Sequence, residues 1–194
     1  MQNAALIIPA AGLSRRHPPN KLLAWLGDQR VIEQTLKTFL GFPLDLYVVV
    51  GHQEEEVREV LIPYAGRGVT LVTNPEFESG MASSLRTGFS ALPAEAEYAG
   101  ISLGDKPFIE RKTIETLLAV LAEKKPLILI PEFEGERGHP VFFRRELFEE
   151  LRGLEGEMGG REIIARCERD VLAVPVQDAG ITLDMDGYLE STNV

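Results

Sequence analysis

Cysteine is almost absent from this chain of 194 residues, which contains only Cys167. A single cysteine excludes a disulfide framework within the chain and a cysteine-rich zinc site, and it is typical of a reducing compartment. Long apolar runs are lacking too: none approaches membrane-spanning length, and no basic segment precedes the apolar residues 4–13. We therefore expect a cytoplasmic protein without a membrane segment or a signal peptide.

Positive charge is also in short supply. The chain has 20 Lys and Arg against 30 Asp and Glu, which gives a formal net charge of −10 at pH 7. Duplex nucleic acid would be repelled except at a local basic patch, so nucleic acid is not expected as a partner. With 44% hydrophobic residues, a chain of this length suits one globular domain with a sizeable core, here residues 1–194.

Short apolar runs alternate along the chain with longer amphipathic stretches. Continuous apolar runs such as LYVVV indicate strands buried on both faces, as in a parallel sheet. Strands are expected at Ala5–Pro9, Leu46–Val50, Thr70–Val72, Tyr98–Leu103, Leu127–Pro131 and Val171–Val174, and helices at Val31–Leu40, Glu54–Leu61, Ala82–Ala91, Arg111–Lys124 and Arg145–Leu151. This alternation predicts right-handed crossovers and a three-layer α/β domain with a mostly parallel central sheet. Ligands bind such sheets beyond the carboxyl ends of the strands.

The first of these strand ends, within LIIPAAGLSRRHPPNK at residues 6–21, has the features of a phosphate loop. It lacks both GxxxxGK[ST] and GxGxxG, which points away from P-loop ATPases and ordinary dinucleotide enzymes. The small residues of the AAG turn let the backbone approach a ligand, and successive N–H groups form an anion-binding concavity. Arg16 and Lys21 are suited to neutralise a triphosphate. The alternative is a plain strand-to-helix turn with solvated cations.

Three aspartates are candidates for a metal site. Asp105 follows an apolar run, and Asp184 and Asp186 alternate around Met185, so an extended chain would point both to one face. Mg²⁺ prefers one or two carboxylates together with substrate phosphates. Asp105 with one member of the later pair therefore predicts a magnesium site. The alternative for either member of that pair is a turn cap with Gly187.

The segment NPEFESGMASSLR, residues 74–86, is the second distinctive stretch. Ser79 begins a helix entry, Ser83 and Ser84 offer hydroxyls in the first turn, and Arg86 adds a cation. A helix N-terminus binds anions through free N–H groups and its dipole. A capping turn also explains Ser79, but not the whole cluster.

A lone histidine, His139, lies between Gly138 and Pro140. It is a candidate acid, base or substrate contact, and the alternative is a structural histidine. The sequence shows no Ser/His/Asp set for nucleophilic catalysis, because none of its serines lies in a G-x-S-x-G elbow.

Five ordered motifs carry a family resemblance. AAGLSRR, with a lysine nine residues after the glycine, resembles the LAAGxSxRMGxxK signature of the MobA-like nucleotidyltransferases. NPEFESGMASSLRTGF is similar to the NPxxxxGMxxSL segment of their molybdenum cofactor cytidylyltransferase branch. LGDKP resembles the GDxP metal motif, GHPV recurs in the family, and LDMDG resembles the start of its DIDTPED ending. The matches span residues 6–186.

The resemblance implies a Rossmann-like nucleotidyltransferase fold that uses a nucleoside triphosphate and Mg²⁺. By this analogy Arg16, Lys21 and Asp105 are catalytic, and Asp105 and Asp186 hold the metal. The nucleotide-binding residues would be Pro9, Ala10, Ala11, Gly12, Ser14, Arg16, Lys21, Asn74 and Gly104. The acceptor, the monophosphate of molybdopterin, would be contacted by Gly80, Met81, Ser83, Ser84, Gly138, His139 and Pro140. A target molybdoenzyme or its chaperone would be a further partner.

The chain departs from the family pattern at two places. His17 and Pro18 replace the usual Met-Gly, and Asp186 is followed by Gly-Tyr-Leu where Thr-Pro-Glu-Asp is expected. The branch with PAAG tends towards CTP and that with LAGG towards GTP, so Pro9–Gly12 favours cytidylyl transfer.

Three other functions are weighed against cytidylyl transfer to molybdopterin. They are guanylyl transfer from GTP, transfer to another phosphorylated acceptor such as a sugar or polyol phosphate, and non-catalytic delivery of a cofactor. Retention of Arg16, Lys21, Asp105 and Asp186 argues against a pure binder, which has no need of a metal pair.

Overall fold

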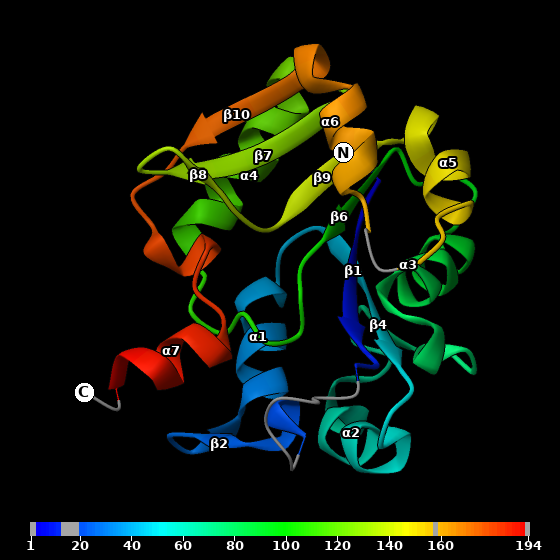
Figure 1. The fold of residues 1–194 in the computed structure, drawn as a ribbon, viewed down its shortest axis with the longest axis vertical. Coiled ribbons are helices and arrows are strands. Elements are labelled where there is room, and N and C mark those ends of the chain that lie inside the picture. The colour runs from blue at the N-terminus through cyan, green and yellow to red at the C-terminus, as the bar shows by residue number, and fades with distance from the viewer. Residues whose placement is uncertain (1–2, 13–19, 157–158, 193–194) are drawn as a thin grey trace.

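A computed structural model describes residues 3–12, 20–156 and 159–192 of the chain (Figure 1). Its centre is an eight-stranded sheet in the order β10-β7-β9-β6-β1-β4-β5, with β8 paired to β7. These strands are β1 (Ala4–Ala10), β4 (Leu44–Val50), β5 (Val69–Thr73), β6 (Tyr98–Ile101), β7 (Ile128–Phe133), β8 (Glu136–Arg137), β9 (Val141–Arg144) and β10 (Val171–Pro175). A separate two-stranded ribbon joins β2 (Trp25–Leu26) and β3 (Gln29–Arg30).

Helices cover both faces of the sheet. They are α1 (Val31–Phe39), α2 (Glu54–Leu61), α3 (Met81–Ser90), α4 (Arg111–Lys124), α5 (Phe148–Arg152), α6 (Arg161–Arg166) and α7 (Met185–Thr192). The side chains of β1 alternate between the two faces: Leu6 and Ile8 pack in one core cluster with α1, α2 and α4. Ala5 and Ile7 pack in the other with α3, α5 and α6. The three-layer α/β architecture with a mostly parallel sheet is thus confirmed.

Strand β9 was not predicted from the sequence. It runs antiparallel to both of its neighbours, β6 and β7, whereas β1, β4, β5 and β6 are mutually parallel. An antiparallel strand begins at the edge where its parallel neighbours end. The residues just before β9 therefore reach the carboxyl edge, where ligands bind.

Two predicted elements differ from the structure. The expected helix Arg145–Leu151 is a 3-10 turn at Arg145–Leu147 followed by α5. The expected extended chain around Met185 is wrong, because α7 begins there. A helical start separates the side chains of Asp184 and Asp186, which an extended chain would have aligned.

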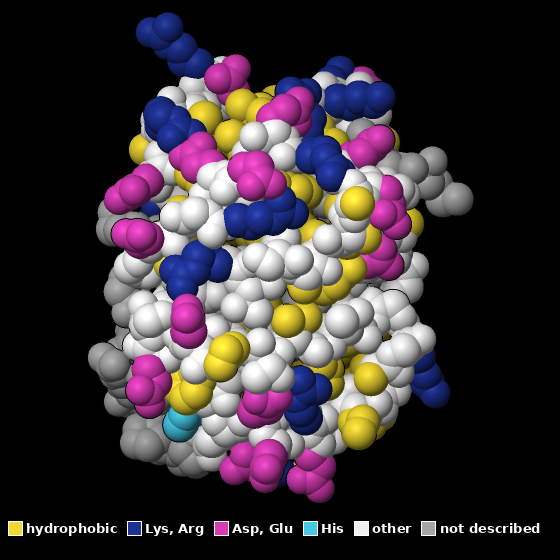
Figure 2. All heavy atoms as spheres, turned by 90° about the vertical axis from the view of Figure 1, so that its right-hand side faces the viewer, with side chains coloured by type: hydrophobic (Ala, Val, Ile, Leu, Met, Phe, Trp, Pro, Cys, Tyr) yellow, Lys and Arg dark blue, Asp and Glu magenta, His cyan; other side chains and the backbone are white. Residues whose placement is uncertain are grey.

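The face shown in Figure 2 carries Asp and Glu intermingled with Lys and Arg, and its apolar side chains occur in small groups. Of the helices in the described part of the chain, none combines the length and the apolar character needed to cross a membrane.

Candidate functional site

The candidate site lies where β1 and β6 end side by side. The N–H of Ser102 donates to Ile7 O at 3.0 Å, and the N–H of Gly104 donates to Pro9 O at 3.1 Å, so the loop after β6 runs along the end of β1. A Cβ atom on Gly104 would lie 3.0 Å from Pro9 O. Glycine therefore permits this close approach, which positions Asp105 beside the first loop.

Lys21 joins the two predicted metal carboxylates. Its Nζ lies 2.5 Å from Asp105 Oδ2 and 3.0 Å from Asp186 Oδ2. The two aspartates come from distant parts of the sequence and are brought together because the N–H of Met185, at the start of α7, donates to Asp105 O at 2.9 Å. Both are buried, with 8% and 5% of their surface exposed.

This triad is an electrostatic site for cations. Burial lowers the pKa of Lys21, but its hydrogen bonds and charge interactions with Asp105 and Asp186 outweigh this effect and leave the pKa raised. Two carboxylates thus converge on one cationic position, which the ammonium group fills. This donor set fits Mg²⁺ or Mn²⁺, because such ions are bound by one or two protein carboxylates together with substrate phosphates.

Asp184 has the capping role that the sequence allowed for one of the pair. Its Oδ1 accepts a hydrogen bond from the N–H of Gly187 at 2.8 Å. Asp186 is the member that faces Lys21.

The predicted phosphate loop is described only in part. Pro9, Ala10 and Ala11 are buried at the end of β1, and Gly12 is exposed. Ser14 and Arg16 lie outside the described residues. No atom of the described residues lies within 4 Å of a Cβ placed on Gly12, so that part of the fold does not demand glycine there.

Asn74, Ser83 and Ser84 form a buried hydrogen-bonded group. The Nδ2 group of Asn74 donates to Ser83 Oγ at 2.9 Å and to Ser84 Oγ at 3.2 Å. Its Oδ1 accepts from the N–H of Glu76 at 3.0 Å. The three side chains thus tie the loop after β5 to the first turn of α3. Asn74, Ser83 and Ser84, which were predicted to contact ligands, are therefore buried side chains that position the loop after β5.

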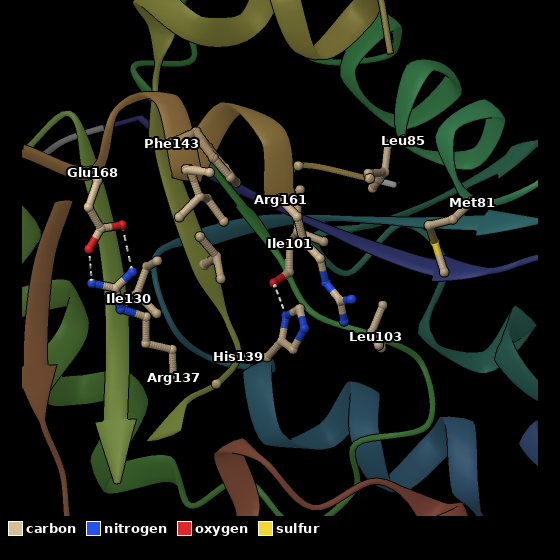
Figure 3. A pocket seen from close by; sticks show the side chains of 16 residues that line it. Met81, Leu85, Ile101, Leu103, Ile130, Arg137, His139, Phe143, Arg161 and Glu168 are labelled. Atoms are coloured by element: carbon tan, nitrogen blue, oxygen red, sulfur yellow. Dashed lines mark hydrogen bonds and ion pairs between the residues drawn. The ribbon is translucent and has the colours of Figure 1, made fainter. Parts of the chain in front are cut away.

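A cavity of about 580 Å³ lies on the other side of β6 (Figure 3). Of the predicted acceptor residues, Met81, Gly138 and His139 line it, whereas Gly80 and Pro140 flank lining residues in the sequence. Its walls are mostly apolar and include Leu85, Ile101, Leu103, Ile130, Val141, Phe143 and Ile164.

Three charged residues of the cavity were missed by the sequence analysis: Arg137, Arg161 and Glu168. Arg137 and Glu168 come from β8 and from the turn before β10, and pairing across the fold brings them together. The only local signal for Arg161 is its position directly after Gly159-Gly160, at the start of a helix.

His139 forms one wall of the cavity. Its backbone N–H donates to Ile181 O at 3.0 Å, and the Nδ1 atom of its ring lies 3.1 Å from Ile101 O. Burial lowers the pKa of His139 to about 4, so the ring is neutral at pH 7. Since a carbonyl only accepts hydrogen bonds, Nδ1 carries the proton and Nε2 does not. The ring therefore has no acidic proton on Nε2 at neutral pH.

In this three-layer α/β fold, the carboxyl edge of the sheet thus holds two aspartates that share one cation, a small-residue turn and an adjacent cavity, an arrangement suited to the class of nucleotidyltransferases. The MobA-like NTP transferase domain matches residues 6–171. The chain belongs to that family.

The chain is also similar in sequence to other proteins along much of its length. The purine catabolism protein PucB of Bacillus subtilis is 28% identical over 184 residues, 91% of this chain and 88% of that protein. The 2-C-methyl-D-erythritol 4-phosphate cytidylyltransferase of Lachnoclostridium phytofermentans is 30% identical over 134 residues, 66% of this chain and 56% of that enzyme.

The crystal structure of Rv0371c from Mycobacterium tuberculosis is similar over the full length of both chains, with a TM-score of 0.81 and 26% identity. A manganese complex of the same protein gives a TM-score of 0.74 and 24% identity, over 99% of this chain and 97% of that one.

Proposed function

We propose that the protein transfers CMP from CTP to the phosphate of molybdopterin and releases pyrophosphate. The observation that carries the proposal is the convergence of Asp105 and Asp186 on one cation, 2.5 and 3.0 Å from Lys21 Nζ. This pair lies beside the end of β1, and Leu103, two residues before Asp105, lines the neighbouring cavity together with His139. A protein that only binds and delivers a cofactor has no need of such a pair.

The metal of the proposal is Mg²⁺, held by Asp105 and Asp186. The manganese complex of Rv0371c supports a divalent ion in this fold. When bound, the ion would neutralise triphosphate charge and orient the α-phosphate for attack.

In the proposed reaction, an oxygen of the acceptor phosphate forms a bond to the α-phosphorus. The bond from the α-phosphorus to the β-bridging oxygen breaks, and its electron pair leaves with pyrophosphate. Lys21 stabilises the charge on the triphosphate, with Arg16 as a predicted second cation, and the Ala10–Gly12 turn supplies N–H groups. The nucleophile is already anionic, so no strong base is required, which suits the neutral ring of His139. Catalysis rests on positioning and charge neutralisation.

The cavity supports a heterocyclic acceptor. Its apolar walls can pack against the faces of a flat pterin ring, whose polar groups lie at the ring edge, whereas a sugar or polyol presents hydroxyl groups in several directions that all need hydrogen-bond partners. The cytidylyltransferase relative from Lachnoclostridium, named for a polyol phosphate, supports the alternative acceptor class. We place the reaction in the cytoplasm, with a molybdoenzyme or its chaperone receiving the product.

The test is to incubate the protein with Mg²⁺, molybdopterin and each of CTP, GTP and ATP, and to measure pyrophosphate. We expect release with CTP above the other two. Replacing molybdopterin with 2-C-methyl-D-erythritol 4-phosphate tests the other acceptor class. Nucleotide binding without pyrophosphate release for any combination would refute the enzymatic proposal.

A matched pair of variants tests the metal site. Asp186→Asn should lower turnover by at least about 100-fold, equivalent to about 2.7 kcal/mol of transition-state stabilisation. Asp184→Asn makes the same chemical change two residues away, at a cap that does not face Lys21. Turnover of this control should change by less than about 3-fold. Equal loss in both variants would contradict the assignment of Asp186.

A further inference from the structure

The cavity beside His139 has apolar walls and two arginines. Of these, Arg137 already forms an ion pair: its guanidinium donates hydrogen bonds to both carboxylate oxygens of Glu168, at 2.9 and 2.6 Å. This fork-to-fork pair satisfies the charge of both partners. Neither Arg137 nor Glu168 is therefore available to recognise a ligand without breaking the pair.

Arg161 differs from Arg137, because none of the described residues that line the cavity forms a hydrogen bond or ion pair with it. In Figure 3, dashed lines join Arg137 to Glu168 and His139 to Ile101, but none reaches Arg161. Its side chain extends from the start of α6 towards His139 and Leu103. Arg161 is an exposed residue, so a permanently charged group borders the largely apolar walls and remains accessible to an anion.

The position of Arg161 relative to the aspartate pair is also informative. The charges of both Arg161 and Asp105 act on the His139 ring. Leu103, which lines the part of the cavity towards which the Arg161 side chain extends, precedes Asp105 by only two residues, so the loop that carries this metal carboxylate borders that end of the cavity. An anion bound by Arg161 would lie at the end of the cavity that faces the reacting phosphorus.

We propose that Arg161 binds the phosphate of the acceptor and holds it for attack on the α-phosphorus, an inference that rests on the proposed function. The planar guanidinium group donates two parallel hydrogen bonds to a phosphate, and the apolar walls receive the ring system. Arg161 then sets the substrate class, a flat heterocycle that carries a phosphate monoester.

Binding of molybdopterin and of its dephosphorylated form, followed by pterin fluorescence, tests this assignment. Wild-type protein should bind the phosphorylated form about 10- to 100-fold more tightly, the range expected for charge-assisted hydrogen bonds. Arg161→Gln should reduce that ratio to within about 3-fold, while CTP affinity stays unchanged. Arg161→Lys should retain part of the preference, because the charge remains but the fork does not. Arg169→Gln is the control, an exposed arginine outside the cavity.

The outcomes separate this inference from the proposed function. An Arg161→Gln protein that keeps the preference for phosphate, or that loses affinity equally for both forms, refutes the role of Arg161. Wild-type protein that binds both forms equally, or neither, also refutes it. If the Arg161-dependent preference is observed but no nucleotide yields pyrophosphate, the role of Arg161 stands and cytidylyl transfer fails. If pyrophosphate is released while Arg161→Gln keeps the preference, only the assignment of Arg161 fails.

Discussion

Removing the ammonium group of Lys21 should strengthen the binding of a divalent ion in the absence of nucleotide. In the structure this group lies 2.5 Å from Asp105 Oδ2 and 3.0 Å from Asp186 Oδ2, so it occupies the position on which both carboxylates converge. A metal ion must displace it or share the carboxylates with it. The variant Lys21→Met keeps much of the side-chain volume and removes the charge.

The expected gain in Mn²⁺ affinity depends on two opposing contributions, the attraction of Lys21 to the carboxylates and the hydration of its ammonium group when it is displaced. Two unit charges about 4 Å apart attract by about 4 kcal/mol at an effective dielectric constant of about 20. Lys21 makes two such pairs, and its displacement in the wild-type protein costs part of that attraction. Rehydration of the ammonium group offsets most of the cost. We therefore expect Lys21→Met to bind Mn²⁺ about 10- to 100-fold more tightly, which is about 1.4–2.8 kcal/mol.

The assay is titration of Mn²⁺ without nucleotide, with the free ion measured by electron paramagnetic resonance. A larger rise of the melting temperature with added Mn²⁺ in the variant is an independent readout. Lys112→Met, at an exposed position on α4, is the control and should bind Mn²⁺ like the wild type. The affinity of the Lys21 variant for CTP should fall, because Lys21 is the cation of the proposed triphosphate site. Unchanged or weaker binding of Mn²⁺ by Lys21→Met would refute the cation site at Asp105 and Asp186.

Three further predictions concern the other parts of the site. Gly12→Ala should leave the free energy of unfolding within about 0.5 kcal/mol of wild type, since no atom of residues 3–12, 20–156 or 159–192 lies within 4 Å of the new Cβ, but should weaken CTP binding; unaltered binding would argue for a plain turn. Burial lowers the pKa of His139 to about 4. The unfolded chain then takes up the proton first, and the free energy of unfolding should fall between about pH 6.5 and 4, by up to about 1.4 kcal/mol per pH unit; an equally steep fall in His139→Asn, followed by urea unfolding, would contradict this. Gly138→Ala should destabilise the fold by about 1–3 kcal/mol, because its Cβ would lie 2.5 Å from Ile181 O, and an unchanged urea midpoint would argue otherwise.

The sequence predicted those features of the site that depend on where strands end. Apolar runs are local signals, so the strand that leads into Ala10–Gly12 and the loop that carries Asp105 were found without tertiary information. The choice between Asp184 and Asp186 was not predictable in this way. It depends on a helix that begins at Met185, whose N–H is fixed by Asp105 O from a distant loop.

Features that depend on contacts across the fold were missed. Strand β9 has four residues, and its antiparallel pairing with β6 and β7 is set by the sheet around it. The proposed role of Arg161 could not be predicted from the sequence either, because its neighbours Leu103 and His139 are remote in the sequence. Motif order predicted the GHP segment as an acceptor loop, but the apolar walls around it come from five separate parts of the chain that only the fold brings together.

The antiparallel pairing of β6 with β9 marks a boundary within the sheet between the strands next to β1 and the strands next to β7. On one side lie β1, which pairs with β6, and the turn after β1, to which the proposed function assigns the triphosphate. On the other, β7, β9 and α6 supply much of the cavity wall. Only the Asp105 loop must meet both substrates. An exchange of residues 128–168 between two such proteins, made at this boundary, would be expected to alter which acceptor is modified while the donor nucleotide stays the same. The mixed sheet thus offers a natural boundary for recombination.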